Sequence, residues 1–279
     1  MDNVHAVTLS AADALALRYG AEHAPAHGPW NEHIALLLSH RSVRGYRPDP
    51  LPSGTLETLV AAAQSAATSS NLQTWSVIAV TDTERKATLA RLAANQKHIE
   101  QCPLFLVWVA DLSRNRRLAD EEGVTLETLP YQETFLVAAI DAALAAQNAT
   151  VAAESLGLSM VYIGALRNQP QAVAEVVGLP PGAFAVFGMC VGYASETAAS
   201  EVKPRLPQAV VLHREVYDSS QEQPLRAAYD HLMAAFSARN DMAADTWTKR
   251  VIGRMGRIAA MSGRDRLVAT LNAMGFELK

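Results

Sequence analysis

Short apolar runs alternate with helix-like segments along most of the chain. Residues 75–82 (WSVIAVTD) and 104–111 (LFLVWVAD) are rich in β-branched and aromatic side chains and end in aspartate, so both predict buried strands. Three later runs predict strands as well: SMVYIG at 159–164, AFAVFGMCVGYA at 183–194 and PQAVVLHREVY at 207–217. The alternation with helical segments indicates an α+β fold.

Helical periodicity and capping residues predict the intervening helices. The first is an amphipathic N-terminal helix capped at Thr8 or Ser10, and Ser53 is the expected N-cap of a helix in TLETLVAAAQSAAT, with Glu57 placed to reach back. Further helices are expected in NEHIALLLSH (31–40), in ERKATLARLAANQKHIEQCP (84–103, with a loop), from about Tyr131 to Leu156, from Pro170 to Val177 and from Glu222 onward. Gly157 is the expected residue after the long helix. No Ser/Pro/Gly-rich linker interrupts the pattern, which predicts one domain with a helical C-terminal excursion.

The most apolar segment, residues 134–158, is long enough to cross a membrane. It also carries four strongly polar residues, Asp141, Gln147, Asn148 and Glu154. These groups would be costly in hydrocarbon, whereas a long helix inside a protein or at a subunit interface can pair them. We therefore expect a buried helix and no membrane span.

Composition and charge exclude several functions. The 279 residues are 49% hydrophobic and 19% charged, with a formal net charge of -4, so neither disorder nor a general attraction to nucleic acid is expected. Cys102 and Cys190 form no CxxC pair and have no Cys/His cluster beside them, so neither a disulfide framework nor a metal site is expected. The N-terminus lacks the pattern of a secretory signal, and we expect a cytoplasmic protein.

Positive charge is concentrated in HRSVRGYRPDP, residues 40–50. Arg41, Ser42 and Arg44 alternate there, and arginine binds phosphate oxygens bidentately while a hydroxyl supplies a further donor. The alternative is a solvated loop whose arginines make weak surface ion pairs with Asp49 or Glu57. The chain has no GxGxxG, GxxxxGK[ST], GxSxG or HExxH motif, so a site here would hold its ligand mainly with side chains.

A second basic pair, Lys203 and Arg205, lies in VKPRLP at residues 202–207. Pro204 and Pro207 stiffen this backbone in an extended conformation. The two basic segments could close on one phosphate, or the second could be an ordinary loop with two exposed charges.

Six segments together carry a resemblance to a known family. The segments are, in order, HRSVRGYRPDPLP, TSSNLQTWSVIAVTD, NQKHIEQCP, AAESLGLSMVYIGALRNQP, FGMCVGYA and KPRLP. Together they resemble the FMN-dependent nitroreductase superfamily, and most specifically its oxygen-insensitive NADPH nitroreductase and flavin reductase branch. The resemblance implies a three-layer α+β fold, with a central mixed, mainly antiparallel sheet flanked by helices. It implies a single FMN-binding domain over residues 31–279, preceded by a helical extension at 1–30, and a homodimer with FMN at the subunit interface.

The resemblance also assigns residues to the cofactor. It places His40, Arg41, Ser42, Lys203 and Arg205 at the FMN phosphate and ribityl end. Arg44 would approach the N1 and O2 edge of the ring, where a cation stabilises the charge gained on reduction. The remaining cofactor residues that it implies are Thr68, Ser69, Ser70, Gln96, Tyr162, Ile163, Gly164 and Ala165. Ala165 stands where relatives commonly have a second glycine.

The implied activity is ping-pong hydride transfer from NADPH through FMN to nitroaromatics, quinones, free flavin or other small planar acceptors. No other catalytic residue is needed, because the cofactor carries the chemistry. Arg239, in SARNDMAADTW, is the residue implied for the 2′-phosphate of NADPH. A flavin-dependent dehalogenase or other reductase on the same fold, or an FMN-binding protein without catalysis, are the alternatives.

Overall fold

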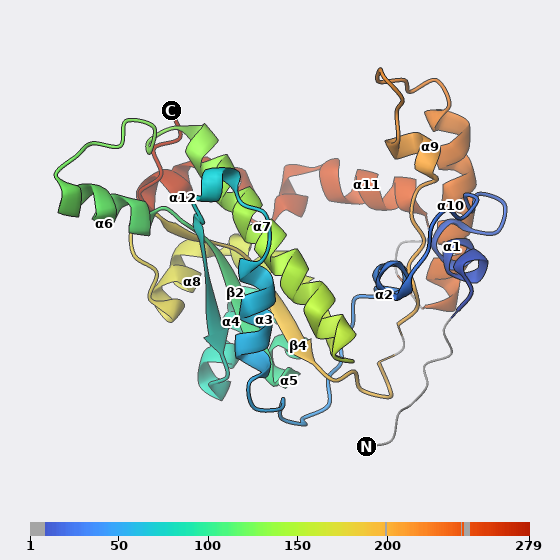
Figure 1. The fold of residues 1–279 in the computed structure, drawn as a ribbon, viewed down its shortest axis with the longest axis horizontal. Coiled ribbons are helices and arrows are strands. Elements are labelled where there is room, and N and C mark those ends of the chain that lie inside the picture. The colour runs from blue at the N-terminus through green and yellow to red at the C-terminus, as the bar shows by residue number, and fades with distance from the viewer. Residues whose placement is uncertain (1–8, 199, 241, 243–245) are drawn as a thin grey trace. The chain divides into compact units, whose positions relative to one another are not determined.

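The computed structural model describes residues 9–198, 200–240, 242 and 246–279 (Figure 1). The chain divides into two compact units. The helical unit combines Met1–Arg41 with Ala199–Ala260, and the sheet unit combines Ser42–Ala198 with Met261–Lys279. The division into an extension at 1–30 and one domain at 31–279 remains a prediction.

The sheet unit is built on four antiparallel strands in the order β1-β2-β4-β3. Their bounds are Trp75–Val80 (β1), Leu104–Asp111 (β2), Ser159–Ile163 (β3) and Ala183–Gly192 (β4). Four of the five predicted strands are therefore confirmed. A parallel bridge between Ser42 and Met160 adds a short mixed element beside β3, and the α+β expectation holds.

The fifth predicted strand, residues 207–217, is wrong. Helix α9 (Gln208–Val211) begins directly after Pro207 there, and the following segment forms no strand. Val216 and Tyr217 are 72% and 77% exposed, so their high strand propensity finds no neighbouring strand to pair with. A short apolar run without a partner does not make a sheet.

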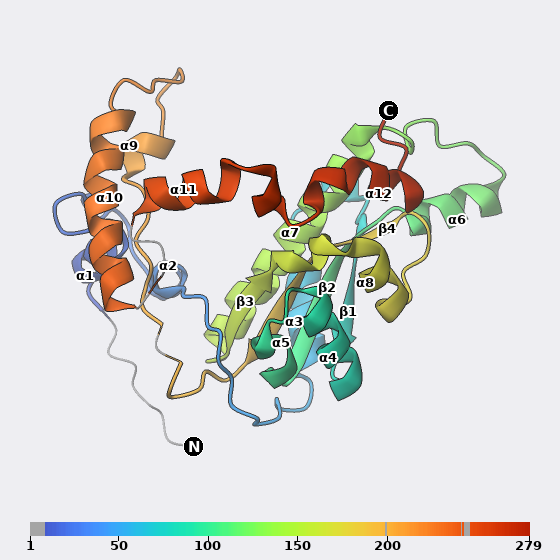
Figure 2. The ribbon, with the colours of Figure 1, turned by 180° about the vertical axis from the view of Figure 1, so that it is seen from behind.

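Helices cover both faces of the sheet (Figures 1 and 2). The helices of the sheet unit are α3 (Thr55–Gln64), α4 (Thr83–Leu92), α5 (Lys97–Gln101), α6 (Ser113–Glu122), α7 (Gln132–Ser155), α8 (Pro170–Val177) and α12 (Leu267–Ala273), with short 3₁₀ turns η1 (Ser69–Asn71), η2 (Gly164–Asn168) and η4 (Arg264–Arg266). Helices α3 and α7 pack on one face, and α4, α5 and α8 pack on the other. This is the expected three-layer arrangement.

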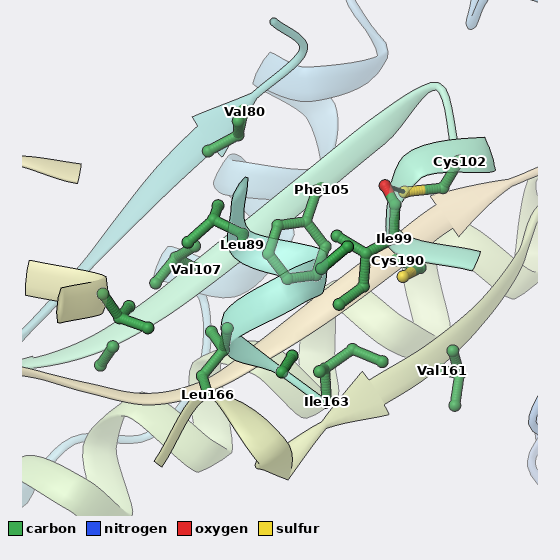
Figure 3. Close-up of a cluster of buried hydrophobic side chains, with 14 of the residues drawn as sticks. Val80, Leu89, Ile99, Cys102, Phe105, Val107, Val161, Ile163, Leu166 and Cys190 are labelled. Atoms are coloured by element: carbon green, nitrogen blue, oxygen red, sulfur yellow. Dashed lines mark hydrogen bonds between the residues drawn. The ribbon is translucent and has the colours of Figure 1, made fainter. Parts of the chain in front are cut away.

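Each layer has an apolar core that the sequence explains. The inward stripe of α7 consists of the small residues Ala142, Ala145, Ala146, Ala149 and Ala153, all fully buried against the sheet. Because these side chains are short, the helix can approach the strands closely. The opposite core is shown in Figure 3, where the rings and branched chains of Phe105, Val107 and Ile163 meet Leu89 and Leu166.

Among the described residues, one helix, α7, is long and apolar enough to cross a membrane, and 39% of its most apolar window is buried. Its polar groups have protein partners, as expected. Asp141 accepts hydrogen bonds from Thr74 and from the main chain of Ser69, and Asn148 donates to the carbonyl of Ala62. The helix is therefore packed as a core element of the sheet unit.

Helix ends agree with most of the predicted caps. Ser10 caps α1 (Ala11–Tyr19) by accepting from the main-chain N–H of Asp13, whereas Thr8 lies outside the described residues. Gly157 follows α7 with a φ of +75°, which favours glycine. The prediction for Ser53 is wrong, because the N-cap of α3 is Gly54, one residue later. Gly54 has a φ of +82°, in the left-handed region that favours glycine.

The helical unit has its own small core. Its helices are α1, α2 (Glu32–Ser39), α9, α10 (Glu222–Arg239) and α11 (Trp247–Met255), and the 3₁₀ turn η3 spans Ile258–Met261. Tyr229, Met233 and Phe236 on α10 form the buried centre, with Leu206 and Trp247 packed against them. The prediction of a helical C-terminal region is confirmed.

Candidate functional site

The two basic segments are neighbours within the helical unit. Helix α2 ends at Ser39, and the chain leaves it in an extended conformation at His40. The side chain of Arg18 donates to the carbonyl oxygens of His40 and Lys203, at 3.0 and 2.7 Å, so the two segments lie within reach of one guanidinium. Arg41 also donates to the carbonyl of Ser200, at 3.2 Å. Segments 162 residues apart in sequence therefore present His40, Arg41, Lys203 and Arg205 together.

The KPRLP backbone is fixed by packing. Pro204 is buried, and its carbonyl accepts a 2.9 Å hydrogen bond from the hydroxyl of Tyr229. Burial raises the pKa of Tyr229, and the nearby cations Arg205, Arg250 and Arg18 act in the opposite direction. The ammonium of Lys203 lies 5.8 Å from the ring centroid of Phe236. These contacts fix the backbone of a segment that carries two basic side chains, Lys203 and Arg205.

Ser42 and Arg44 follow Arg41 in the chain but belong to the sheet unit. The main-chain N–H of Val43 donates to the carbonyl of Met160 at 3.0 Å, so the segment runs beside β3. Val43 and Tyr46 are buried, whereas Ser42 and Arg44 are exposed. The extended backbone therefore directs Ser42 and Arg44 away from the core.

The polar loop of Thr68, Ser69 and Ser70 has an unusual backbone. Ser70, Asn71 and Gln73 have positive φ angles of 49°, 55° and 50°. The hydroxyl oxygen of Thr68 is buried and has no hydrogen-bond partner among the residues that the structure describes. A buried hydroxyl without a partner is uncommon, so it is available for a ligand.

Gln96 lies at the start of α5, after two residues in the left-handed region, Ala94 and Asn95. His98 follows on the same helix, and its Nε2 atom is buried without a hydrogen-bond partner in the described structure. The pKa of His98 is lowered by burial and also by the charge of Arg44. The imidazole is therefore favoured in its neutral form, close to a cation.

The segment from Tyr162 to Ala165 joins the end of β3 to η2. A Cβ at Gly164 would lie 3.3 Å from the guanidinium of Arg167, a tight contact, so the glycine leaves room for Arg167 beside the backbone. Tyr162 packs edge-on against Phe187, with ring centroids 5.1 Å apart, and shares a 2.9 Å hydrogen bond with the hydroxyl of Thr150. Burial raises the pKa of Tyr162 to about 12. Tyr162 is therefore a packing group at the strand end, with a neutral hydroxyl.

A cavity of about 440 Å³ in the sheet unit was not predicted from the sequence. Its walls include Arg167 and Asn168 of η2, Gln169 just before α8, Arg266 of η4 and Thr270 of α12. Arg167 donates to the carbonyl of Val186, and Oδ1 of Asn168 is buried without a hydrogen-bond partner in the described part of the chain. The two arginines make this cavity suited to an electron-rich molecule, and Oδ1 of Asn168 can accept a hydrogen bond from a donor on that molecule. The only sequence signal was the LRN run after Gly164.

Arg239, the residue expected at NADPH, lies at the end of α10 in the helical unit. Its guanidinium forms an ion pair with Glu201 at 3.2 Å, and both line a cavity of about 500 Å³ together with Arg41 and Ser39. The hydroxyl of Ser200, in the same wall, is buried and has no hydrogen-bond partner within the described ranges. Residues 241 and 243–245 of the SARNDMAADTW segment lie outside the described residues.

The cysteines and metal-ligating residues show no further site among the residues described. Cys102 and Cys190 are both free and buried (Figure 3), and burial raises the pKa of the Cys190 thiol. No group of three or more His, Cys, Asp or Glu side chains in the described structure could hold a metal ion.

The predicted site residues thus fall into two sets. His40, Arg41, Lys203, Arg205 and Arg239 lie in the helical unit, and the sheet unit holds Ser42, Arg44, Thr68, Ser69, Ser70, Gln96, Tyr162, Ile163, Gly164 and Ala165. The first set offers cations, which suit a phosphate group. The second set offers a glycine, an arginine and the buried Thr68 hydroxyl without a partner in the described structure, and such groups suit the ring of a flavin mononucleotide.

Comparison with known proteins gives consistent matches. Residues 37–193 match the Nitroreductase family, and residues 203–279 match the Nitroreductase family, C-terminal domain. The chain is 38% identical over 230 residues to FMN reductase (NADPH) of Bacillus subtilis, covering 81% of this chain and 92% of the relative. It is 36% identical over 220 residues to the oxygen-insensitive NADPH nitroreductase of Salmonella typhimurium, covering 78% and 88%. The solved structure of B. megaterium NfrA2 superposes with a TM-score of 0.83 at 39% identity, over 90% of this chain and all of that one.

Proposed function

Because the chain belongs to the nitroreductase family, we propose that it is an FMN-dependent NAD(P)H oxidoreductase that reduces free flavin, nitroaromatics or quinones. The fold is the nitroreductase fold, and relatives that cover most of the chain are named as FMN reductase and NADPH nitroreductase. The observation in this chain that carries the proposal is the pairing of the two basic segments around Arg18. That pairing supports the proposal, because a flavin phosphate would require an anion site of this kind.

The phosphate end is assigned to His40, Arg41, Ser42, Lys203 and Arg205. Arginine and lysine neutralise a phosphate dianion, and the fork of Arg41 or Arg205 can bind two oxygens at once. Ser42 would donate its hydroxyl to the phosphate or the ribityl chain. The assignment holds whether these side chains come from one chain or from both subunits of a dimer.

The ring end is assigned to the sheet unit. Gly164 and Ala165 let the backbone approach a flat ring closely, and Tyr162 and Ile163 support that backbone from the core. Arg44 and Gln96 would bind the polar edge of the ring, and Thr68, Ser69 and Ser70 would donate hydroxyl or main-chain hydrogen bonds. When bound, FMN accepts hydride from a nicotinamide and passes electrons to an acceptor. The role of Arg44 is to stabilise the negative charge that the ring gains on reduction.

The acceptor is assigned to the cavity beside Arg167, because this cavity is open, polar and directly follows the segment at Gly164. Small planar aromatic molecules with nitro or carbonyl oxygens suit the two arginines of this cavity, which donate hydrogen bonds. NADPH is the proposed donor, with Arg239 binding its 2′-phosphate. The exposed position of Arg239 at the end of a helix is compatible with binding a nucleotide.

A cytoplasmic homodimer is the proposed assembly. Helix α7 exposes Leu136, Ile140 and Leu144, which are 50%, 48% and 42% accessible and four residues apart, so they form one apolar stripe. Such a stripe opposite the buried alanine face supports burial by a second copy of this chain. FMN at that interface is part of the same proposal.

An absorbance spectrum of the purified protein, before and after anaerobic NADPH, tests the proposed function. The expected result is a flavin spectrum that bleaches with NADPH and returns on addition of a quinone or nitrofuran. A protein that cannot be loaded with FMN would overturn the proposal. Bound flavin that NADPH does not bleach would indicate a non-catalytic binder, and halide release with a halogenated aromatic would indicate a dehalogenase.

A further inference from the structure

Arg18 is a buried cation in the first helix of the chain. It lies on the inward face of α1 with Ala14 and Leu15, and it is only 6% exposed. A buried arginine is costly unless its donors are satisfied. It also lies outside both stretches that match the nitroreductase family, residues 37–193 and 203–279.

The guanidinium of Arg18 joins the main chains of two separate segments. One terminal nitrogen, Nη2, donates to the carbonyls of Leu38 and His40, at 2.6 and 3.0 Å. The other, Nη1, donates to the carbonyl of Lys203 at 2.7 Å. In return, the main-chain N–H of Arg205 donates to the carbonyl of Arg18 at 2.8 Å.

The contacts of Arg18 satisfy main-chain carbonyls at the end of a helix in the helical unit. The carbonyls of Leu38 and His40 lie at the C-terminal end of α2, which has no basic residue in its last turn. Carbonyls at a helix C-terminus lack intrahelical partners and favour a cation. Arg18 supplies that cation from another helix, and its planar fork reaches the second segment at the same time, which the single ammonium of a lysine could not do in the same geometry.

We propose that Arg18 is a positioning residue for the FMN phosphate, which holds the segments of His40 and Arg41 and of Lys203 and Arg205 in register with each other. This inference rests on the proposed function, because it takes those four side chains as the phosphate site. Arg18 bonds to main-chain atoms of His40, Lys203 and Arg205, so it fixes the backbones that carry these side chains. The N-terminal segment thereby completes a cofactor site that the matched family regions supply in two separate pieces.

The test compares FMN with riboflavin, which has the same ring but no phosphate. Dissociation constants are measured by flavin fluorescence on the full-length protein after the flavin has been removed. The variants are Arg18→Met, which removes the donors, and Arg18→Lys, which keeps the charge and loses the fork. Arg226→Met is the matched control, since Arg226 lies in the same unit on α10 and forms an exposed ion pair with Glu222 at 3.0 Å.

We expect Arg18→Met to weaken FMN binding about tenfold or more and to change riboflavin binding by less than about twofold. The reason is that the charge-assisted hydrogen bonds of Arg18 position only the residues proposed to bind the phosphate, which riboflavin lacks. Arg18→Lys should give an intermediate loss, and Arg226→Met none. Circular dichroism checks folding, and if Arg18→Met does not fold, Arg18→Lys decides. Equal losses for FMN and riboflavin, or no loss in a folded variant, would overturn the role of Arg18. Failure of the wild-type protein to bind FMN would instead overturn the proposed function.

Discussion

The carboxylate of Asp141 on α7 holds Thr74, 67 residues earlier in the chain, by two hydrogen bonds. Oδ2 accepts from the main-chain N–H and from the hydroxyl of Thr74, at 3.2 and 3.1 Å, while Oδ1 accepts from the N–H of Ser69 at 3.1 Å. Asp141 is 1% exposed. These bonds clamp both ends of a loop in which Ser70, Asn71 and Gln73 have positive φ. The loop that carries the predicted flavin hydroxyls is thus anchored from the core.

We predict that Asp141→Asn lowers both stability and FMN affinity. An amide can accept with one oxygen only, so its NH₂ group would face the donors of Thr74 or Ser69 and leave a buried group unsatisfied, which costs about 1–3 kcal/mol. Denaturant unfolding of the flavin-free protein measures the first effect, and an FMN titration measures the second. Glu133→Gln, an exposed change of the same type in the first turn of α7, should leave FMN affinity unchanged and lower stability by no more than about 1 kcal/mol, the contribution of a carboxylate at a helix N-terminus. Wild-type affinity in a destabilised Asp141→Asn protein would show that the loop does not touch flavin.

The sequence predicted correctly those elements of the fold that are determined by residues close together in the chain. The strand at 104–111 is a continuous apolar run, so its pattern and its structure coincide residue for residue. The strand at 75–82 was predicted two residues too long, because Asp82 leaves the sheet and caps α4 by accepting from the N–H of Arg85. Helix α6 was not predicted, because its sequence has no apolar stripe. The segment at 207–217 was wrongly predicted as a strand, because it has strand propensity but no partner strand.

The candidate site divides in the same way. The basic segments at 40–44 and 203–205 are visible as local concentrations of charge. The family resemblance assigns no role to Arg47, and in the structure Arg47 forms an exposed ion pair with Asp49 at 3.3 Å. The partners of Arg18 and Asp141 could not be predicted, because they lie 20–185 and 67–72 residues away and bond mostly through main-chain atoms that carry no sequence signal. The cavity at Arg167 likewise depends on how the C-terminal segment packs.

His98 should make folding sensitive to mild acid. Its pKa lies below the ordinary 6.5 because burial, with Arg44 nearby, disfavours the charged ring. The unfolded chain therefore binds a proton more readily than the folded one, so stability is complete above about pH 6.5, falls as the pH drops below it and levels off below the folded pKa.

The measurement is the free energy of unfolding of wild type and His98→Gln between about pH 5 and 8. The stability of the variant relative to the wild type should increase as the pH falls. His27→Gln is the control for replacing an exposed histidine. A difference between His98→Gln and wild type that does not vary with pH would contradict the assigned environment.

Arg44→Ala should lower the two-electron midpoint potential of bound FMN. Losing a hydrogen bond to a charged group costs about 1.5–3 kcal/mol, which corresponds to about 30–60 mV for two electrons. Dye-coupled anaerobic titration measures the shift. Arg47→Ala is the control, since Arg47 lies three residues away and its guanidinium contacts Asp49 and the ring of Tyr193. A potential that moves equally in both variants would mean that Arg44 acts only through the overall charge.

Glu201 should weaken the preference for NADPH. Its carboxylate pairs with Arg239, so a 2′-phosphate must compete with it for the guanidinium. We expect Glu201→Gln to lower the KM for NADPH about two- to fivefold, since an exposed ion pair contributes up to about 1 kcal/mol, and to leave that for NADH unchanged. Arg239→Ala should raise the KM for NADPH far more than that for NADH. Glu222→Gln, which breaks the pair with Arg226, is the control, and equal changes for both nucleotides would refute a role at the 2′-phosphate.

Gly188→Ala should displace η2, the segment that carries the proposed flavin residues Gly164 and Ala165. Gly188 sits on β4 opposite Val107 and Ile163, and a methyl group there would overlap the ring of Phe105 and lie 3.1 Å from Cδ1 of Leu166. Overpacking a filled core costs about 1–3 kcal/mol. Because Leu166 lies in η2, directly after Gly164 and Ala165, its displacement should also weaken FMN binding.

Thermal unfolding and an FMN titration measure the two effects of Gly188→Ala. The matched control is Gly253→Ala in α11, where no atom lies within 4 Å of the added methyl group. That control should stabilise its helix by about 1 kcal/mol, because alanine loses less backbone entropy than glycine. Wild-type stability in Gly188→Ala would mean that Phe105 can move aside, and unchanged FMN affinity in a destabilised variant would separate η2 from the cofactor.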